Sequence, residues 1–190
     1  MSMTISDNKR KLDSKFFSLL VGCVSIVMMF TAYTSAYIVR QAGGNWLEFD
    51  LPKEFTFSTV IIVLSSVALQ FSYGFFKSGK ALLYRGFLVL AFILGLYFLI
   101  MQYQGWLALN VAGITLDGNP SGSFIFVISG VHAAHILGGI ACLIVALIHA
   151  FSLDYFISEK RTNRFKMVLT YWHFVGLIWI YLFIFFNVQR

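Results

Sequence analysis

Long apolar stretches alternate with short polar segments along the whole chain. Five stretches fall at about residues 16–39, 56–76, 86–109, 123–150 and 167–188. A transmembrane helix needs about 20 predominantly apolar residues, and every stretch reaches that length. The pattern therefore predicts an all-α membrane protein, a single bundle of five transmembrane helices over residues 16–190. Residues 1–15 are polar and basic, and we expect them to form a tail ahead of this domain.

Basic residues are distributed unevenly among the segments that connect the apolar stretches. Eleven of the 14 Lys and Arg residues lie in the N-terminal tail, in residues 77–85 and in residues 151–166, which five spans place on one side of a membrane. Cytoplasmic segments carry an excess of Lys and Arg, so we expect a cytoplasmic N-terminus and a periplasmic C-terminus. The first apolar stretch exceeds the core of a cleaved signal peptide, about 7–15 residues, and we expect it to be retained.

The composition agrees with a membrane protein. Hydrophobic residues make up 59% of the chain and charged residues only 12%, with a mean hydropathy of +0.81. Soluble domains carry about one-quarter charged residues. The net charge of +6 would suit a nucleic-acid partner, but the basic residues lie between the spans, so we expect topology to explain them and no nucleic acid to bind.

All four histidines lie in the last two apolar stretches, at positions 132, 135, 149 and 173, and no Asp or Glu lies in any of the five. Pumps and carriers commonly depend on acidic groups within the membrane. The chain also lacks an internal repeat of the kind that builds carriers. A small carrier therefore remains only an alternative.

Imidazoles within a membrane can bind metals, hold haem or form hydrogen bonds. His132 and His135 have no third ligand at matching depth, so we expect no metal site there. His149 and His173 are predicted at similar depth on different helices, which leaves a small membrane cytochrome as a second alternative. Because unpaired polar groups are costly in lipid, we expect the histidines mainly to bond to neighbouring groups or to lipid headgroups.

Other polar and small residues in the spans suggest helix contacts. Gln70 and Gln102 are expected to bridge helices. Small side chains that would permit close helix approach occur at Gly130, Ala134, Gly138 and Gly139. Candidates for binding anionic lipid headgroups are Arg40, Arg85 and the pair Lys160 and Arg161.

Two histidine-containing segments resemble subunit III of the haem-copper terminal oxidases, which include cytochrome c oxidases and quinol oxidases. Residues 129–139, SGVHAAHILGG, resemble one signature of that family, and residues 171–179, YWHFVGLIW, resemble the signature near its C-terminus. The order and spacing of the two segments also match. Five spans resemble the short bacterial form, so the resemblance covers almost the whole chain from Phe16 onward.

The resemblance implies a non-catalytic subunit that packs against oxidase subunit I, holds phospholipid and stabilises the catalytic subunit during oxygen reduction coupled to charge translocation. Haem and copper are then expected on partner subunits, with none on this chain. Subunit II and other respiratory subunits are further expected partners, and the bacterial inner membrane is the expected location. The positions that we expect to have structural or lipid-linked roles are His132, His135, Trp172, His173, Arg40 and Arg85.

The sequence departs from the family wherever the family carries an acid within or beside the bundle. The positions concerned hold Ile26, Gly105, Lys166 and Gly176. A direct role in proton uptake through those acids is therefore not expected. The packing and lipid-holding roles depend on shape and on the histidine and tryptophan motifs, and we expect them to remain.

Overall fold

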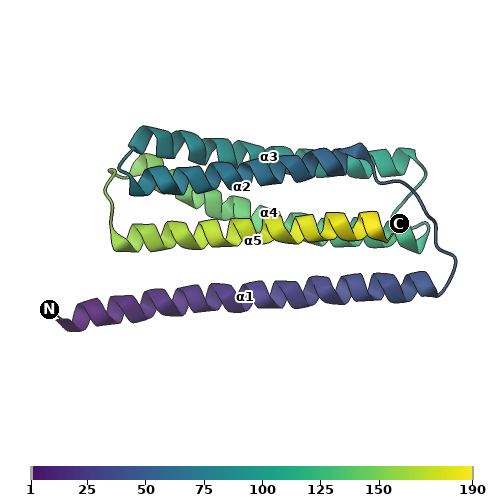
Figure 1. Ribbon diagram of the computed structural model, residues 1–190, viewed down its shortest axis with the longest axis horizontal. Helices are drawn as coiled ribbons and strands as arrows, with labels where there is room; N and C mark the ends of the chain where they lie inside the picture. The colour runs from purple at the N-terminus through teal and green to yellow at the C-terminus, as the bar shows by residue number, and fades with distance from the viewer. Residues whose placement is uncertain (1, 190) are drawn as a thin grey trace.

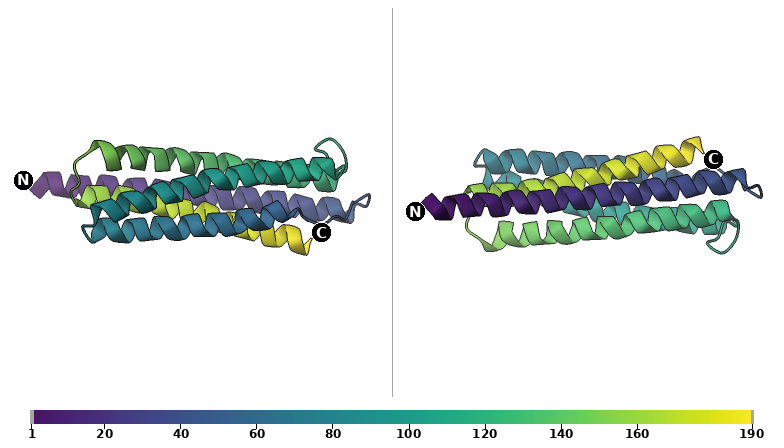
Figure 2. Two further views of the ribbon diagram at one scale, coloured as in Figure 1. Left: turned by 90° about the horizontal axis from the view of Figure 1, so that it is seen from above. Right: turned by 90° about the horizontal axis from the view of Figure 1, so that it is seen from below.

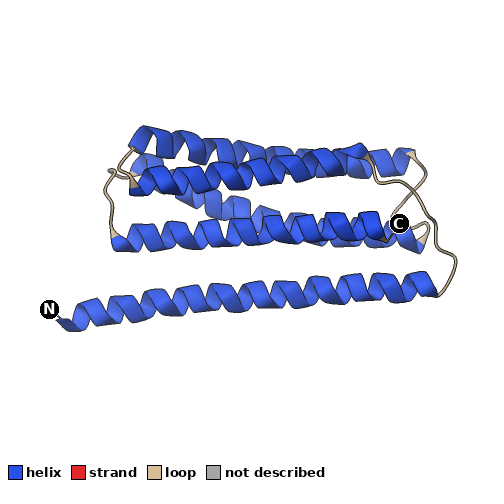
Figure 3. Cartoon of the chain, in the orientation of Figure 1, coloured by secondary structure: helices blue, strands red, loops and turns tan. Residues whose placement is uncertain are grey.

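The computed structural model describes residues 2–189, with side chains from Ser14 onward. Its helices are α1 (Ser2–Ala42), α2 (Lys53–Lys77), α3 (Ala81–Val111), α4 (Pro120–Ser152) and α5 (Glu159–Val188). The rest of the described range is loop and turn (Figure 3). Five helices are long and apolar enough to cross a membrane, which confirms the predicted all-α bundle of five spans.

The helices extend beyond the predicted spans, and in α4 and α5 a polar capping side chain marks where the helix begins. In α5 the side chain of Ser158 accepts a hydrogen bond from the backbone N–H of Arg161 at 3.3 Å, so the helix starts eight residues before position 167. In α4 the side chain of Asn119 accepts from the N–H of Ser121 at 3.0 Å. The backbone of residues 2–15, expected as a tail, continues α1.

Helices α2 to α5 form a closed ring, in which α2 packs on α3 and α5, and α4 packs on α3 and α5. Helix α1 lies along one side of this ring and packs only on α4 and α5 within the described residues (Figures 1 and 2). The termini lie at opposite ends of the bundle (Figure 1). The end that carries the N-terminus, the α2–α3 turn and the α4–α5 connection is called the basic end below.

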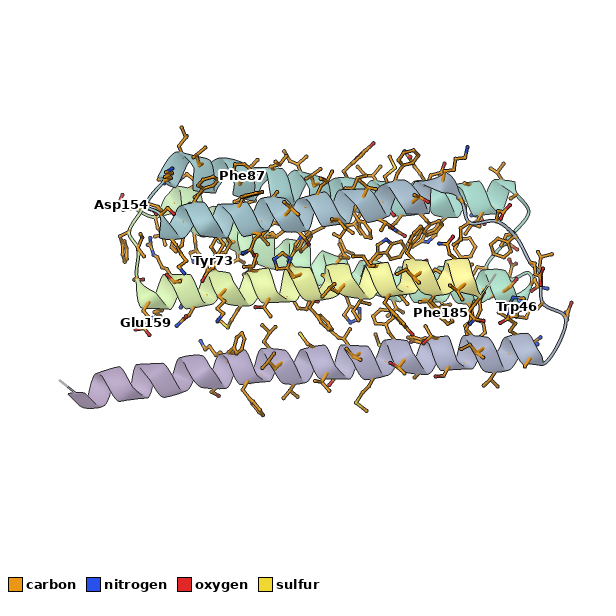
Figure 4. All side chains as sticks on the ribbon, in the orientation of Figure 1. Trp46, Tyr73, Phe87, Asp154, Glu159 and Phe185 are labelled. Atoms are coloured by element: carbon orange, nitrogen blue, oxygen red, sulfur yellow. The ribbon has the colours of Figure 1, made fainter. Side chains whose placement is uncertain are left out.

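Helix α1 is attached to the ring mainly by its C-terminal half. The Phe30 ring lies 6.0 Å from the ring of His132, and the Tyr37 ring lies 5.1 Å from that of Phe185. Gln41 donates its side-chain N–H to the backbone carbonyl of Gln189 at 3.0 Å. Figure 4 shows Phe185 and Trp46 at the end of the bundle opposite the basic end.

Small residues allow two helices to approach the centre of the ring. A methyl group added at Gly95 or at Gly139 would lie 2.8 Å or 2.9 Å from the ring of Trp172, which confirms the expected close approach at Gly139. A methyl group added at Gly138 would lie 3.6 Å from the hydroxyl of Tyr171. Gly130 has open space where a side chain would be, so no other helix in the described part of the chain approaches it closely. Ala134 is exposed and makes no such contact.

Candidate functional site

Trp172 lies at the centre of the ring and contacts three other helices. Its indole N–H donates a hydrogen bond to the hydroxyl of Ser65 on α2 at 3.1 Å. The Ser65 hydroxyl donates in turn to the backbone carbonyl of Ala91 on α3 at 2.7 Å. The indole ring fills the space over Gly95 on α3 and Gly139 on α4. Trp172 therefore joins all four helices of the ring through packing and a relay of two hydrogen bonds.

His132 is fully buried in an aromatic shell. The rings of Phe98 and Trp179 lie 6.0 Å and 5.2 Å from its imidazole, and Phe30 covers it from α1. Neither ring nitrogen has a hydrogen-bond partner among the described residues. The expectation that the histidines mainly bond to neighbouring groups or lipid headgroups is therefore wrong for His132, which lies among the rings of Phe98, Trp179 and Phe30.

His135 and His173 do form the expected hydrogen bonds. Nδ1 of His135 lies 2.8 Å from the carbonyl oxygen of Val131 one turn earlier in α4. Nε2 of His173 lies 3.1 Å from Oε1 of Gln70, which joins α5 to α2. Gln102 donates to the hydroxyl of Ser58 at 2.9 Å and joins α3 to α2. The expected helix-bridging role of Gln70 and Gln102 is thus confirmed by geometry.

The two arginines singled out from the sequence contact carbonyl groups near helix ends. Nη1 of Arg40 donates to the carbonyl of Gly44 at 2.9 Å, just after α1. Nε of Arg85 donates to the carbonyl of Ala150 at 2.8 Å, in the last turn of α4. The carbonyl of Ala150, being in the last turn of α4, has no partner within its own helix. Trp172 and His132 are buried at the centre of the ring, whereas Arg40 and Arg85 lie near helix ends. The six predicted residues are therefore spread over the bundle and do not form one site.

A cavity of about 710 Å³ opens between α1, α4 and α5 at the basic end, and we call it the basic-end cavity. Its lining is mostly apolar, and Arg161, Arg164 and His149 are among its polar side chains. None of the six predicted residues lines it. Arg161 was singled out from the sequence as part of a basic pair and His149 as a possible haem ligand, whereas Arg164 was not singled out. Only the folded bundle brings the three side chains to one cavity.

The two histidines proposed as haem ligands are not brought together. His149 lines the basic-end cavity, whereas His173 lines a separate groove between α2 and α5. Within residues 14–189 no three His, Cys, Asp or Glu side chains gather where they could hold a metal ion. The geometry offers no common space for a haem between His149 and His173.

Positions where the resembled family carries acids are adapted to their replacements. A methyl group added at Gly105 would lie 2.9 Å from the ring of Phe55, so the aromatic ring occupies the space of a longer side chain. At Gly176 an added methyl group would lie 3.3 Å from the hydroxyl of Ser66. Ile26 packs against the buried core. The apolar replacements are therefore built into the packing.

These observations define the class of the protein: a multi-pass helical membrane protein whose intramembrane polar groups mainly connect helices. Comparison with known proteins gives the family. Residues 26–189 match the family model for cytochrome c oxidase subunit III. The chain belongs to this family, which makes it a non-catalytic oxidase subunit III and does not favour the small cytochrome or the carrier.

Individual relatives agree with this assignment. A Corynebacterium diphtheriae protein named cytochrome c oxidase subunit 3 is 31% identical over 83% of this chain and 80% of its own length. A Mycobacterium tuberculosis protein named "Probable cytochrome c oxidase subunit 3" is 30% identical over 82% of this chain and 76% of its own. A Mus musculus protein named cytochrome c oxidase subunit 3 is 25% identical over 88% of this chain and 67% of its own length.

Proposed function

We propose that this chain packs against the catalytic subunit I of a haem-copper oxidase in a bacterial inner membrane and stabilises it during oxygen reduction coupled to charge translocation. The N-terminus and the basic end face the cytoplasm, as the positive-inside rule requires. Haem and copper are held by partner subunits, which include subunit II. The observation that supports this role is the use of intramembrane polar groups, Trp172, Ser65, Gln102 and Ser58, for bonds between helices.

The second part of the proposed role is the binding of phospholipid in the basic-end cavity. Its volume of about 710 Å³ falls within the range of about 300–1,000 Å³ typical of small-molecule sites. An acyl chain would lie against the apolar wall formed by Val145, Met167 and Val168. Basic pockets between transmembrane helices on the cytoplasmic side suit anionic lipid headgroups.

The two arginines of the cavity differ in their availability. Arg161 donates to the carbonyl of Asp154 at 2.6 Å, and its guanidinium lies 3.8 Å from the centre of the Phe156 ring. Arg164 is exposed and has no hydrogen-bond partner among the described residues. Its guanidinium is therefore free to form paired hydrogen bonds with a lipid phosphate.

The six positions nominated from the sequence take a structural role in this proposal. Trp172 and His132 fill the centre of the ring, and His135 and His173 hold local and interhelical bonds. Arg40 and Arg85 satisfy carbonyls near the ends of α1 and α4. In this proposal Arg164 and Arg161, and not these six residues, bind the lipid headgroup.

The test is to tag the C-terminus, extract native membranes in mild detergent and identify co-purifying proteins and lipids by mass spectrometry. We expect a multi-span haem-copper subunit in near-equal amount, with anionic phospholipid retained. The variant Arg164→Gln should lose bound anionic lipid, and the control Lys53→Gln, at the opposite end of the bundle, should keep it. A chain that elutes alone contradicts the oxidase role, and equal lipid in both variants contradicts the lipid site.

A further inference from the structure

A second hollow, the α2–α5 groove, lies on the face of the ring formed by α2 and α5. Its volume is about 480 Å³. Val63, Val67 and Leu177 line it with apolar side chains, and Ser66 and Gly176 are the small residues of its lining. Small residues let helices approach closely within a membrane, and here they bring α2 and α5 together, since a methyl group at Gly176 would lie 3.3 Å from the hydroxyl of Ser66.

The α2–α5 groove also contains a polar pair at a depth where lipid offers no hydrogen bonds. Gln70 and His173, which bond to each other, both line it. Gln70 lies seven residues from Lys77 and His173 lies seven residues from Lys166, which is about 10 Å along each helix at 1.5 Å per residue. The pair therefore lies inside the hydrocarbon layer, which is about 30 Å thick.

The hydrogen-bonding capacity of this pair is only partly used. With Nε2 of His173 donating to Oε1 of Gln70, the amide nitrogen of exposed Gln70 has no partner among the described residues. Exposed hydroxyl groups on α1 find a hydrogen-bond partner within their own helix: Ser25 donates to the carbonyl of Val21, and Thr31 donates to that of Val27. The amide nitrogen of Gln70 makes no such bond among the described residues, and an acyl chain cannot accept its hydrogen bonds.

We propose that the α2–α5 groove receives a transmembrane helix of the partner oxidase subunit, which presents a side-chain oxygen to the amide nitrogen of Gln70. This inference rests on the proposed function, since it needs an oxidase partner in the same membrane. Val63, Val67 and Leu177 are exposed and would pack against the apolar side chains of the partner helix. The groove thereby identifies the docking face of the chain.

Site-specific photo-crosslinking in native membranes tests the docking face. A benzophenone amino acid replaces Val67 in the groove, which is 45% exposed, or Leu90 on α3, which is 44% exposed and outside the groove. We expect one discrete adduct with a multi-span partner subunit from position 67 and none from position 90. An adduct only with lipid or with a second copy from position 67, while the oxidase still co-purifies, overturns the docking face and leaves the proposed function intact.

A second measurement tests the polar contact. The double variant Gln70→Leu/His173→Leu should retain about threefold to tenfold less partner subunit after detergent extraction, which corresponds to one or two interhelical hydrogen bonds in a membrane. The control Gln104→Leu replaces an exposed glutamine on α3 and should retain the normal amount. Equal retention in both variants overturns the polar contact. Loss of the partner from the unsubstituted chain instead contradicts the oxidase role itself.

Discussion

The indole of Trp172 and the hydroxyl of Ser65 share a hydrogen bond of 3.1 Å across the centre of the bundle. Because Ser65 also donates to the carbonyl of Ala91, the bond fixes the relative depth of α5, α2 and α3. Both side chains are fully buried, so no water competes for the bond. A residue of the family signature thus acts here as the point at which the ring of helices is aligned.

Trp172→Phe should lower the free energy of unfolding of the purified protein by about 1 kcal/mol, because the hydrogen bond to Ser65 is lost while most of the ring remains. Trp172→Ala should lower it by about 3–5 kcal/mol, since a large cavity opens over Gly95 and Gly139. Detergent-based unfolding titrations measure both values. Equal losses in the two variants would show that the bond, and not the packing, carries the effect.

Gly139→Ala should lower the free energy of unfolding by about 1–3 kcal/mol, because the added methyl group would lie 2.9 Å from the buried ring of Trp172. Gly130→Ala is the matched control in the same helix. It meets open space, and alanine favours helix, so no loss is expected there. The thermal midpoints of the two variants in detergent provide the comparison, and similar midpoints would contradict the close approach.

His132→Leu should raise the free energy of unfolding by about 1 kcal/mol, because it removes two buried nitrogen atoms that have no hydrogen-bond partner. The hydrogen-bonded role expected from the sequence predicts a loss instead. His135→Leu, which removes the contact with the carbonyl of Val131, serves as the comparison and should not be stabilising. A clear destabilisation by His132→Leu, measured by the same unfolding titration, would show that the imidazole is bonded in the native state.

Tyr181→Phe should loosen α1, because the hydroxyl of Tyr181 lies 2.9 Å from Oγ1 of Thr34 and joins α5 to α1. An interhelical bond in a membrane contributes about 0.6 kcal/mol on average, so amide hydrogen exchange in residues 30–42 should rise about threefold. Tyr97→Phe is the control, since Tyr97 is 43% exposed against 44% for Tyr181 and has no hydroxyl partner among the described residues. Equal exchange in both variants would remove this bond as an attachment of α1.

Much of the candidate site could be predicted from residue type alone. Trp172, His135 and His173 lie in motifs, and polar groups in an apolar span must find partners, so bonds between helices at Gln70 and Gln102 followed from the cost of unpaired polar groups in lipid. The partners themselves could not be predicted. Ser65 is 107 residues from Trp172, and only the crossing of α2 and α5 brings them together.

The sequence by itself determined the five spans and the family, because span length follows from the thickness of a bilayer and the motifs are local. The tertiary structure alone decided which face each polar residue takes. It buried His132 with no hydrogen-bond partner among the described residues, placed His149 and His173 in separate hollows, and brought Arg161 and Arg164 to the lining of one cavity. A helix that is apolar on every side can turn any face inward, so only its packing against neighbours fixes these positions.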